Sequence, residues 1–151
     1  MTIISRIIAS AIDEVLSTAP ETNSIFLGVF ARNELPKSPP YPSCLVFNTE
    51  PRGHSGEHWL GLYYDSGGKC YFFDSYAMPA SRYGLNAYLD KTSISWTENK
   101  IRIQGNSQYC GHYVIFFLLF RARSKSLSFF QSFGTNYSRN DKKIKALIDE
   151  F

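Results

Sequence analysis

Cysteine is scarce in this sequence, and the few cysteines show no regular spacing. The 151 residues contain three of them, Cys44, Cys70 and Cys110. An odd number of irregularly spaced cysteines argues against a disulfide scaffold and is typical of a reducing compartment. We therefore expect an intracellular protein.

Long apolar runs, internal repeats and low-complexity tracts are also missing. The opening segment, MTIISRIIASAIDEVL, carries Arg6, Asp13 and Glu14 inside its apolar pattern, which is not the pattern of a signal peptide. The apolar run from Tyr113 to Phe120 is too short to cross a bilayer. We expect neither a signal peptide nor a membrane partner.

The net charge is small, +3 at pH 7, and does not by itself name a partner. Basic residues gather in the segment from Arg121 to Lys145. One interpretation of this segment is an ordinary solvated surface, and the other is a patch that binds a polyanion such as nucleic acid. A composition of 44% hydrophobic and 16% aromatic residues predicts a folded globular protein, and the length suits one domain over residues 1–151.

The hydrophobic patterns predict both helices and strands. Helical spacing of apolar residues predicts a first helix within residues 3–16, and the prolines of 35–42 predict an extended loop. We expect strands at 44–48, 58–64, 70–74 and 100–104, a helix capped by Ser81, a buried helix through 113–120 and a closing helix from about Ser138, with 24–30 ambiguous. This order indicates an α+β domain with helices packed on a sheet centred on the hairpin of 58–74.

Cys110 lies between a small polar loop and the buried helix. In the first turn of that helix, unpaired backbone N–H groups and the positive end of the helix dipole favour a thiolate over a thiol. A cysteine there is held rigidly and can still open onto a surface. The position indicates a nucleophile, although a lone cysteine is more commonly a small buried apolar residue.

His58 and Asp74 stand at the two ends of the predicted hairpin, whose turn is DSGGK. If the turn is centred on Ser66, the two residues face each other directly, with Cβ atoms roughly 4.5–5.5 Å apart. Asp74 can then orient the His58 ring. A shift of the register by two residues leaves them diagonal neighbours, whereas a shift by one places them on opposite faces.

Together these residues predict nucleophilic catalysis. Cys110 would be the nucleophile, His58 the base and later the acid, and Asp74 the orienting group. The Cys110 backbone N–H and the Gln104 side-chain amide would stabilise the oxyanion of the tetrahedral intermediate. Each of these residues also has an ordinary structural interpretation.

A metal site is the chemical alternative. It would use His54, His58 and either Cys44 or Cys110 as ligands. His54 and His58 have the spacing of a helical pair, but the glycines around them disfavour a helix. We therefore expect no metal.

Four motifs occur together in the chain: FLGVFARNELP at 26–36, NT at 48–49 followed by GEHW at 56–59, YFFDSY at 71–76 and QGNSQYCGHY at 104–113. They resemble, in the same order, the motifs of the adenain family, the adenovirus-type cysteine proteases, which are related to the proteases that cut ubiquitin-like proteins. In that family they carry the catalytic His, its acidic partner, the oxyanion Gln and the nucleophilic Cys. The resemblance maps these roles onto His58, Asp74, Gln104 and Cys110.

The resemblance implies a papain-like cysteine protease fold, a mixed sheet with the nucleophile at the start of a buried central helix. It implies a cysteine endopeptidase that cleaves after glycine in structural precursors of a virus or virus-like element, in the host nucleus or the virion. Two alternatives stay open: a protease that removes ubiquitin-like modifiers, and a binding module that has lost catalysis. Trp59 would border the substrate cleft and favour glycine before the cut, with a core tryptophan as its alternative.

Members of the family use a peptide and DNA as activators, and the adenovirus enzymes bind the peptide by a disulfide upstream of the Gln. No cysteine lies between Asp90 and Ile103 in this sequence. We therefore expect no covalently bound cofactor. A non-covalent peptide, and DNA at the segment from Arg121 to Lys145, are the activators that the resemblance still allows.

Overall fold

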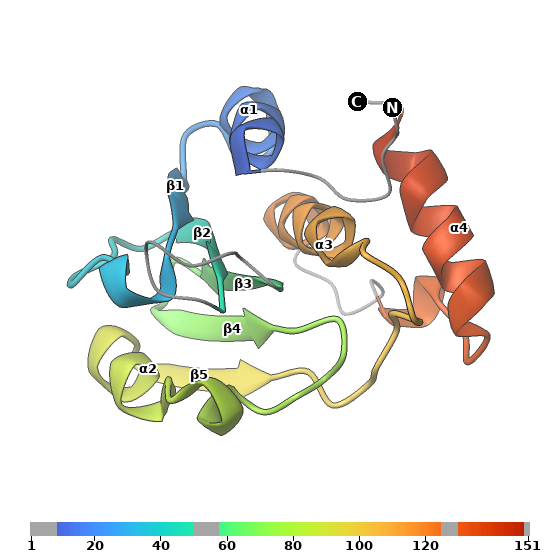
Figure 1. Cartoon of the computed structure of the whole chain (residues 1–151). Coiled ribbons are helices and arrows are strands. Elements are labelled where there is room, and N and C mark those ends of the chain that lie inside the picture. The colour runs from blue at the N-terminus through green and yellow to red at the C-terminus, as the bar shows by residue number, and fades with distance from the viewer. Residues whose placement is uncertain (1–8, 50–57, 125–129, 150–151) are drawn as a thin grey trace.

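The computed structural model describes residues 9–49, 58–124 and 130–149, and it shows a five-stranded mixed sheet with helices on both faces (Figure 1). The spatial order is β1-β2-β3-β4-β5, and the strands are Phe26–Phe30, Ser43–Asn48, Trp59–Tyr64, Lys69–Phe73 and Ser95–Glu98. The outer pairs, β1 with β2 and β4 with β5, are parallel, whereas β3 is antiparallel to both of its neighbours. β3 is therefore the central strand, as predicted.

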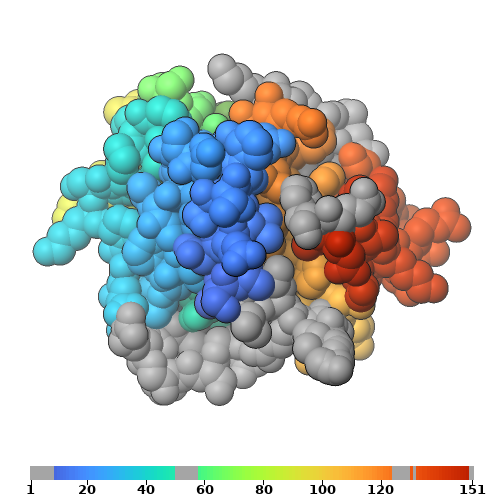
Figure 2. All heavy atoms as spheres, turned by 90° about the horizontal axis from the view of Figure 1, so that it is seen from above, coloured from blue at the N-terminus to red at the C-terminus, as the bar shows by residue number. Residues whose placement is uncertain are grey.

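Helices α1 (Ala9–Thr18) and α3 (Cys110–Ser124) pack on one face of the sheet, and α4 (Tyr137–Ile148) packs against α3. The short helix α2 (Asn86–Thr92) lies beside β5 and covers the other face (Figure 1). Seen from above, α1 crosses the middle of the molecule, with α4 to one side of it (Figure 2). The alternation of β3 side chains separates two cores, because Tyr63 faces α3 and Leu60 and Leu62 face α2.

The central helix α3 is apolar on nearly every side, because the sheet, α1 and α4 surround it. Tyr113, Val114 and Leu118 are fully buried. Gly61 allows the helix to approach β3 closely, since a Cβ at that position would lie 3.0 Å from Cγ1 of Val114. The buried helix predicted from the sequence is confirmed, and Cys110 is its first residue.

The β3–β4 hairpin forms, but its register differs from the one expected. The structure pairs Gly61 with Phe73, which shifts the register by two residues. The reason is that the loop is centred on Gly67. The backbone carbonyl of Lys69 accepts a hydrogen bond from the Asp65 backbone N–H at 2.9 Å, and Gly68 adopts a left-handed φ of 88°. His58 and Asp74 are consequently diagonal neighbours on one face.

The prediction of a strand at 100–104 is wrong. The segment that pairs with β4 is β5, which lies earlier in the sequence. β5 is a half-exposed edge strand, and its sequence lacks a strong alternation of apolar and polar residues. The side chain of Asn99 ends this pairing, because its Oδ1 accepts from the Asp74 N–H at 3.0 Å and its Nδ2 donates to the Asp74 carbonyl at 2.7 Å. Beyond it, the N–H groups of Ile103 and Gln104 both donate to the carbonyl of Ser75.

The remaining elements agree with the prediction in type and differ in their bounds. The ambiguous segment holds β1, and the described part of the first helix buries Ile12 and Leu16. Ser81 does not cap a helix but lies within the short 3₁₀ helix η2 (Ala80–Tyr83), after which α2 begins. Asn136 caps α4 by accepting the Arg139 N–H at 3.0 Å. No helix among the described residues is long and apolar enough to cross a membrane.

Candidate active site

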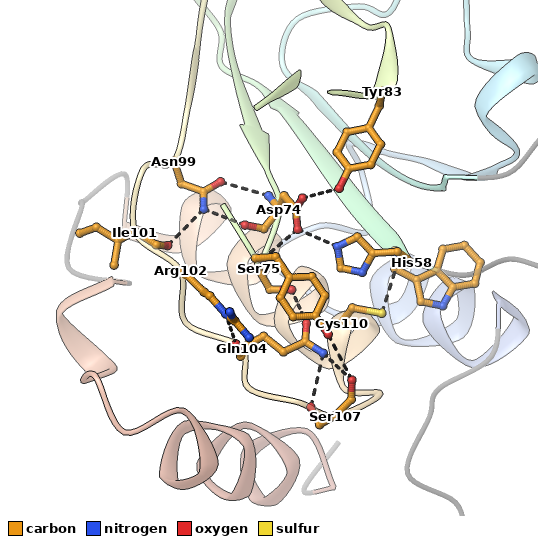
Figure 3. A network of polar contacts seen from close by, with 12 residues as sticks. His58, Asp74, Ser75, Tyr83, Asn99, Ile101, Arg102, Gln104, Ser107 and Cys110 are labelled. Atoms are coloured by element: carbon orange, nitrogen blue, oxygen red, sulfur yellow. Dashed lines mark hydrogen bonds and ion pairs between the residues drawn. The ribbon is translucent and has the colours of Figure 1, made fainter. Parts of the chain in front are cut away.

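His58 and Asp74 meet where the central strands end. His58 immediately precedes β3 and Asp74 immediately follows β4, and their side chains lie on the same face. His58 Nε2 is 2.6 Å from Asp74 Oδ1, with the carboxylate fully buried (Figure 3). The pairing that the sequence predicted is therefore present, reached by a diagonal contact.

This contact shifts the pKa of both groups. Burial alone would lower the pKa of His58, but hydrogen bonds and charges at Asp74 and Cys110 outweigh it and raise the pKa to about 9. Burial alone would raise the pKa of Asp74, but hydrogen bonds from His58, Tyr83 and the Tyr76 backbone hold it below its usual range. Both shifts favour the charged forms, an imidazolium beside a carboxylate.

Cys110 reaches the same place from the opposite face of the sheet, at the first turn of α3. The Trp59 backbone N–H donates to its Sγ at 3.4 Å, and the sulfur lies close enough to His58 to contribute to the raised pKa of the imidazole. Because Asp74 occupies Nε2 of the imidazole, Nδ1 is the ring nitrogen left for Cys110. The arrangement places the sulfur of Cys110 beside the imidazole of His58.

Gln104 is fully buried beside the loop that leads into Cys110. Its Oε1 accepts a short hydrogen bond from the Ser75 hydroxyl, which directs Nε2 to the other side. Nε2 donates to the Ser107 carbonyl at 3.0 Å and lies 3.3 Å from the Ser107 hydroxyl. The amide is thus held in one orientation close to the start of α3 (Figure 3).

Several residues that sequence reasoning missed complete the surroundings of Asp74. The Tyr83 hydroxyl donates to Oδ2 at 2.6 Å, and the Tyr76 N–H donates to Oδ1 at 2.9 Å. The Tyr76 ring also packs on the His58 ring, with centroids 4.9 Å apart. The motif YFFDSY contained Tyr76, but no sequence signal pointed to Tyr83 or Asn99, because their role depends on how η2 and β5 pack.

Helix α4 holds the segment that carries Gln104. Asp141 Oδ1 accepts the Tyr113 hydroxyl at 2.7 Å and the Gly105 N–H at 3.2 Å. Asn140 donates to the Ile103 carbonyl at 3.0 Å, and both α4 side chains are buried. Gly105 is required for this contact, because a Cβ there would lie 2.8 Å from Asp141 Oδ2.

Trp59 is the first residue of β3, is half-buried and packs against the core around α3. Its backbone touches Cys110, but its ring begins on the face opposite His58, as the strand alternation predicted. A role in the substrate cleft stays a prediction.

The residues considered for a metal do not gather at one point in the part of the chain described. His54 lies outside the described residues, and Cys44 is buried within β2. No group of three or more His, Cys, Asp or Glu residues among the described positions is placed to hold an ion.

The basic segment from Arg121 to Lys145 is divided among different contacts. Arg121 is buried, and its guanidinium carbon lies 3.8 Å from the centre of the Tyr71 ring. Lys145 pairs with Asp149 at 2.7 Å. Arg139 and Lys142 are exposed on α4. The segment is therefore not one uniform surface, because Arg121 takes part in packing α3 on β4.

No protein-family model matches the sequence, and no curated protein matches it. The fold does match solved structures. ChlaDub1 from Chlamydia trachomatis gives a TM-score of 0.51 over 72% of this chain and 58% of its own, at 15% identity. The Chlamydia trachomatis effector protein Cdu1, solved bound to ubiquitin, gives 0.52 over 72% of this chain and 59% of its own, at 13% identity.

The Se-Met ASFV pS273R protease matches less well, with a TM-score of 0.43 over 67% of this chain and 43% of its own, at 20% identity. The present chain spans 58–59% of the two Chlamydia structures. The α+β fold predicted from the sequence, a mixed sheet with the buried helix of Cys110 packed on it, is confirmed, and the two Chlamydia structures share this fold. The comparisons do not single out the adenain family.

The contacts of α4 predict a measurable effect of Asp141→Ala. The variant leaves the Gly105 N–H and the Tyr113 hydroxyl without their buried acceptor, which costs about 1–3 kcal/mol of unfolding free energy. Urea denaturation measures this loss, and hydrogen exchange of the Gly105 amide should accelerate. The matched control is Asp149→Ala at the exposed end of the same helix, which should change both quantities less. Equal effects of the two variants would show that Asp141 does not hold this segment.

Proposed function

We propose that this chain is a cysteine endopeptidase. The observation that supports it most is the position of His58, which is bonded to Asp74 at 2.6 Å and lies beside Cys110 at the first turn of a buried helix. The fold is the one in which such sites occur. The presence of all four expected residues in one place argues against a binding module that has lost catalysis.

In this proposal Cys110 acts as a thiolate beside the His58 imidazolium. The thiolate attacks the scissile carbonyl, and His58 Nδ1 gives its proton to the departing amine as the acyl-enzyme forms. A water molecule then attacks the thioester, with His58 taking its proton, and the acid product leaves Cys110. Asp74 keeps the ring oriented and compensates its charge throughout.

The oxyanion would be stabilised by the Cys110 N–H and the Gln104 amide. The Gln104 N–H that faces the Ser107 hydroxyl at 3.3 Å makes the weaker of its two hydrogen bonds. That hydrogen is the one we expect a substrate oxyanion to take over. Ser75 and the α4 contacts would keep the amide in place before substrate binds.

For the substrate we propose cleavage after glycine in structural precursors of a virus or virus-like element, with action in the host nucleus or virion. The four motifs that resemble the adenain family support this choice. Removal of ubiquitin-like modifiers is the second candidate, because one structure with the same fold was solved bound to ubiquitin. Both candidates need a narrow site before the scissile bond.

Activation by a non-covalent peptide or by DNA belongs to the same proposal. The exposed Arg139 and Lys142 on α4 are the residues of the basic segment best placed to meet a phosphate backbone.

The nucleophile is tested with an electrophile attached to a peptide that ends in glycine. Mass spectrometry should locate the adduct on Cys110 alone, because burial raises the pKa of Cys44 and of Cys70 to about 12. Cys110→Ala should lower kcat/KM by at least about 10⁴-fold. Cys44→Ala and Cys70→Ala serve as controls and should keep their activity. Turnover retained by Cys110→Ala would overturn the proposal.

The preference for glycine is tested with two peptides that carry glycine or alanine before the scissile bond. A narrow site should cleave the glycine peptide about 10-fold faster, since one methyl group is enough to obstruct it. Trp59→Leu keeps an apolar side chain but removes the ring, and it should reduce this ratio. Equal rates for both peptides would rule out a narrow site. Cleavage of a ubiquitin fusion but of neither peptide would favour the modifier-removing alternative.

A further inference from the structure

A depression of about 400 Å³ lies on one side of His58. Its walls come from segments that are far apart in the sequence, and its described lining includes Arg32, His58, Tyr76, Met78, Arg82 and Tyr83. Cys110 and Gln104 are not part of this described lining. It therefore adjoins the proposed site on the histidine side alone.

The chemistry of peptide cleavage says which part of a substrate passes this place. His58 gives its proton to the departing amine, so the amine must lie against the imidazole. The residues that follow the scissile bond then continue past His58. The depression is thus positioned to take the leaving side of the substrate, an argument that rests on the proposed function.

The described lining of the depression is cationic, and the cationic character continues beyond it. Arg32 and Arg82 line it, and a second depression of about 560 Å³ shares Arg32 as a wall and adds Lys37 and Lys91. No Asp or Glu among the described residues lines either one. The charge of the His58 imidazolium does not add to this field, because the Asp74 carboxylate compensates it.

Both arginines have guanidinium N–H groups that can bind a ligand. Arg82 is exposed, and Arg32 is half-buried with its Nη1 donating to the Tyr83 carbonyl at 3.4 Å. A guanidinium carries five N–H donors, and that bond uses one of them. The fork geometry of the remaining donors suits a carboxylate.

We propose that the enzyme prefers substrates whose leaving side carries acidic residues, with Asp or Glu side chains bound by Arg82 and Arg32. Met78, which is 41% exposed at the rim, supplies an apolar contact for the stem of such a residue. An acidic stretch of a protein precursor fits this surface. A basic stretch is repelled by it.

The test uses three peptides that are identical up to the glycine before the cut and continue with Asp-Asp, Asn-Asn or Lys-Lys. At low salt kcat/KM should be about fivefold higher for the Asp-Asp peptide than for the Asn-Asn peptide, with the Lys-Lys peptide the slowest. Salt should reduce the difference. Arg82→Glu should lower kcat/KM for the Asp-Asp peptide toward the value for the Asn-Asn peptide, because Arg32 alone then remains in the depression to bind a carboxylate.

The control is Lys69→Glu, the same change of charge at the start of β4 and outside both depressions, which should keep the wild-type order. Equal kcat/KM for the three peptides, or a preference for the Asp-Asp peptide that Arg82→Glu does not reduce, would overturn the acidic preference and leave the proposed function standing. If the wild type cleaves none of the peptides, the proposed function fails, and fluorescence anisotropy with the Cys110→Ala protein then decides whether acidic peptides bind better. Duplex DNA that binds through Arg82 while the peptides show no charge preference would assign the surface to nucleic acid and overturn the proposal.

Discussion

The packing of α3 across β3 determines where Cys110 lies. The helix is buried along most of its length, so it has little freedom to tilt or slide without opening a cavity. Gly61 lets Val114 approach the strand, and a larger side chain there would push the helix away. The same contact brings Sγ of Cys110 to the backbone of Trp59, next to His58. A core interaction therefore sets the distance on which the proposed chemistry depends.

The second constraint is electrostatic. A carboxylate as deeply buried as that of Asp74 must be compensated by donors and by charge. Tyr83 and the Tyr76 backbone supply donors, and His58 supplies both a donor and a proton. Because the proton on His58 stabilises the buried charge, the same contact that keeps Asp74 ionised raises the pKa of the imidazole. Structural stability and proton supply at this site have one origin.

The sequence was enough to predict the central hairpin, the buried helix and the four residues that gather around it. Those features follow from local patterns: an apolar run after a polar loop, and polar residues at the ends of two apolar strands.

The predicted hairpin register was wrong by two residues, because the turn is centred one residue later than expected. Gly68 adopts a left-handed conformation in this turn, and the DSGGK motif alone does not distinguish it from a turn one residue earlier. β5 was missed because it is a half-exposed edge strand whose pairing depends on its neighbour. The roles of Asn99, Tyr83 and Asp141 arise only from tertiary packing, where an ordinary polar residue meets a backbone group from a distant segment. Whether the four residues perform catalysis remains a prediction.

The titration of His58 tests the account most directly. With the imidazole labelled with ¹⁵N, NMR spectra recorded over pH should show a ring that keeps its proton at neutral pH and loses it near pH 9. In Asp74→Asn the carboxylate charge is gone, so the pKa should move down, since the charge that favours the imidazolium has been removed. A His58 that titrates near 6.5 in the wild type and does not respond to Asp74→Asn would contradict the claim that Asp74 and Cys110 hold it as a charged proton donor.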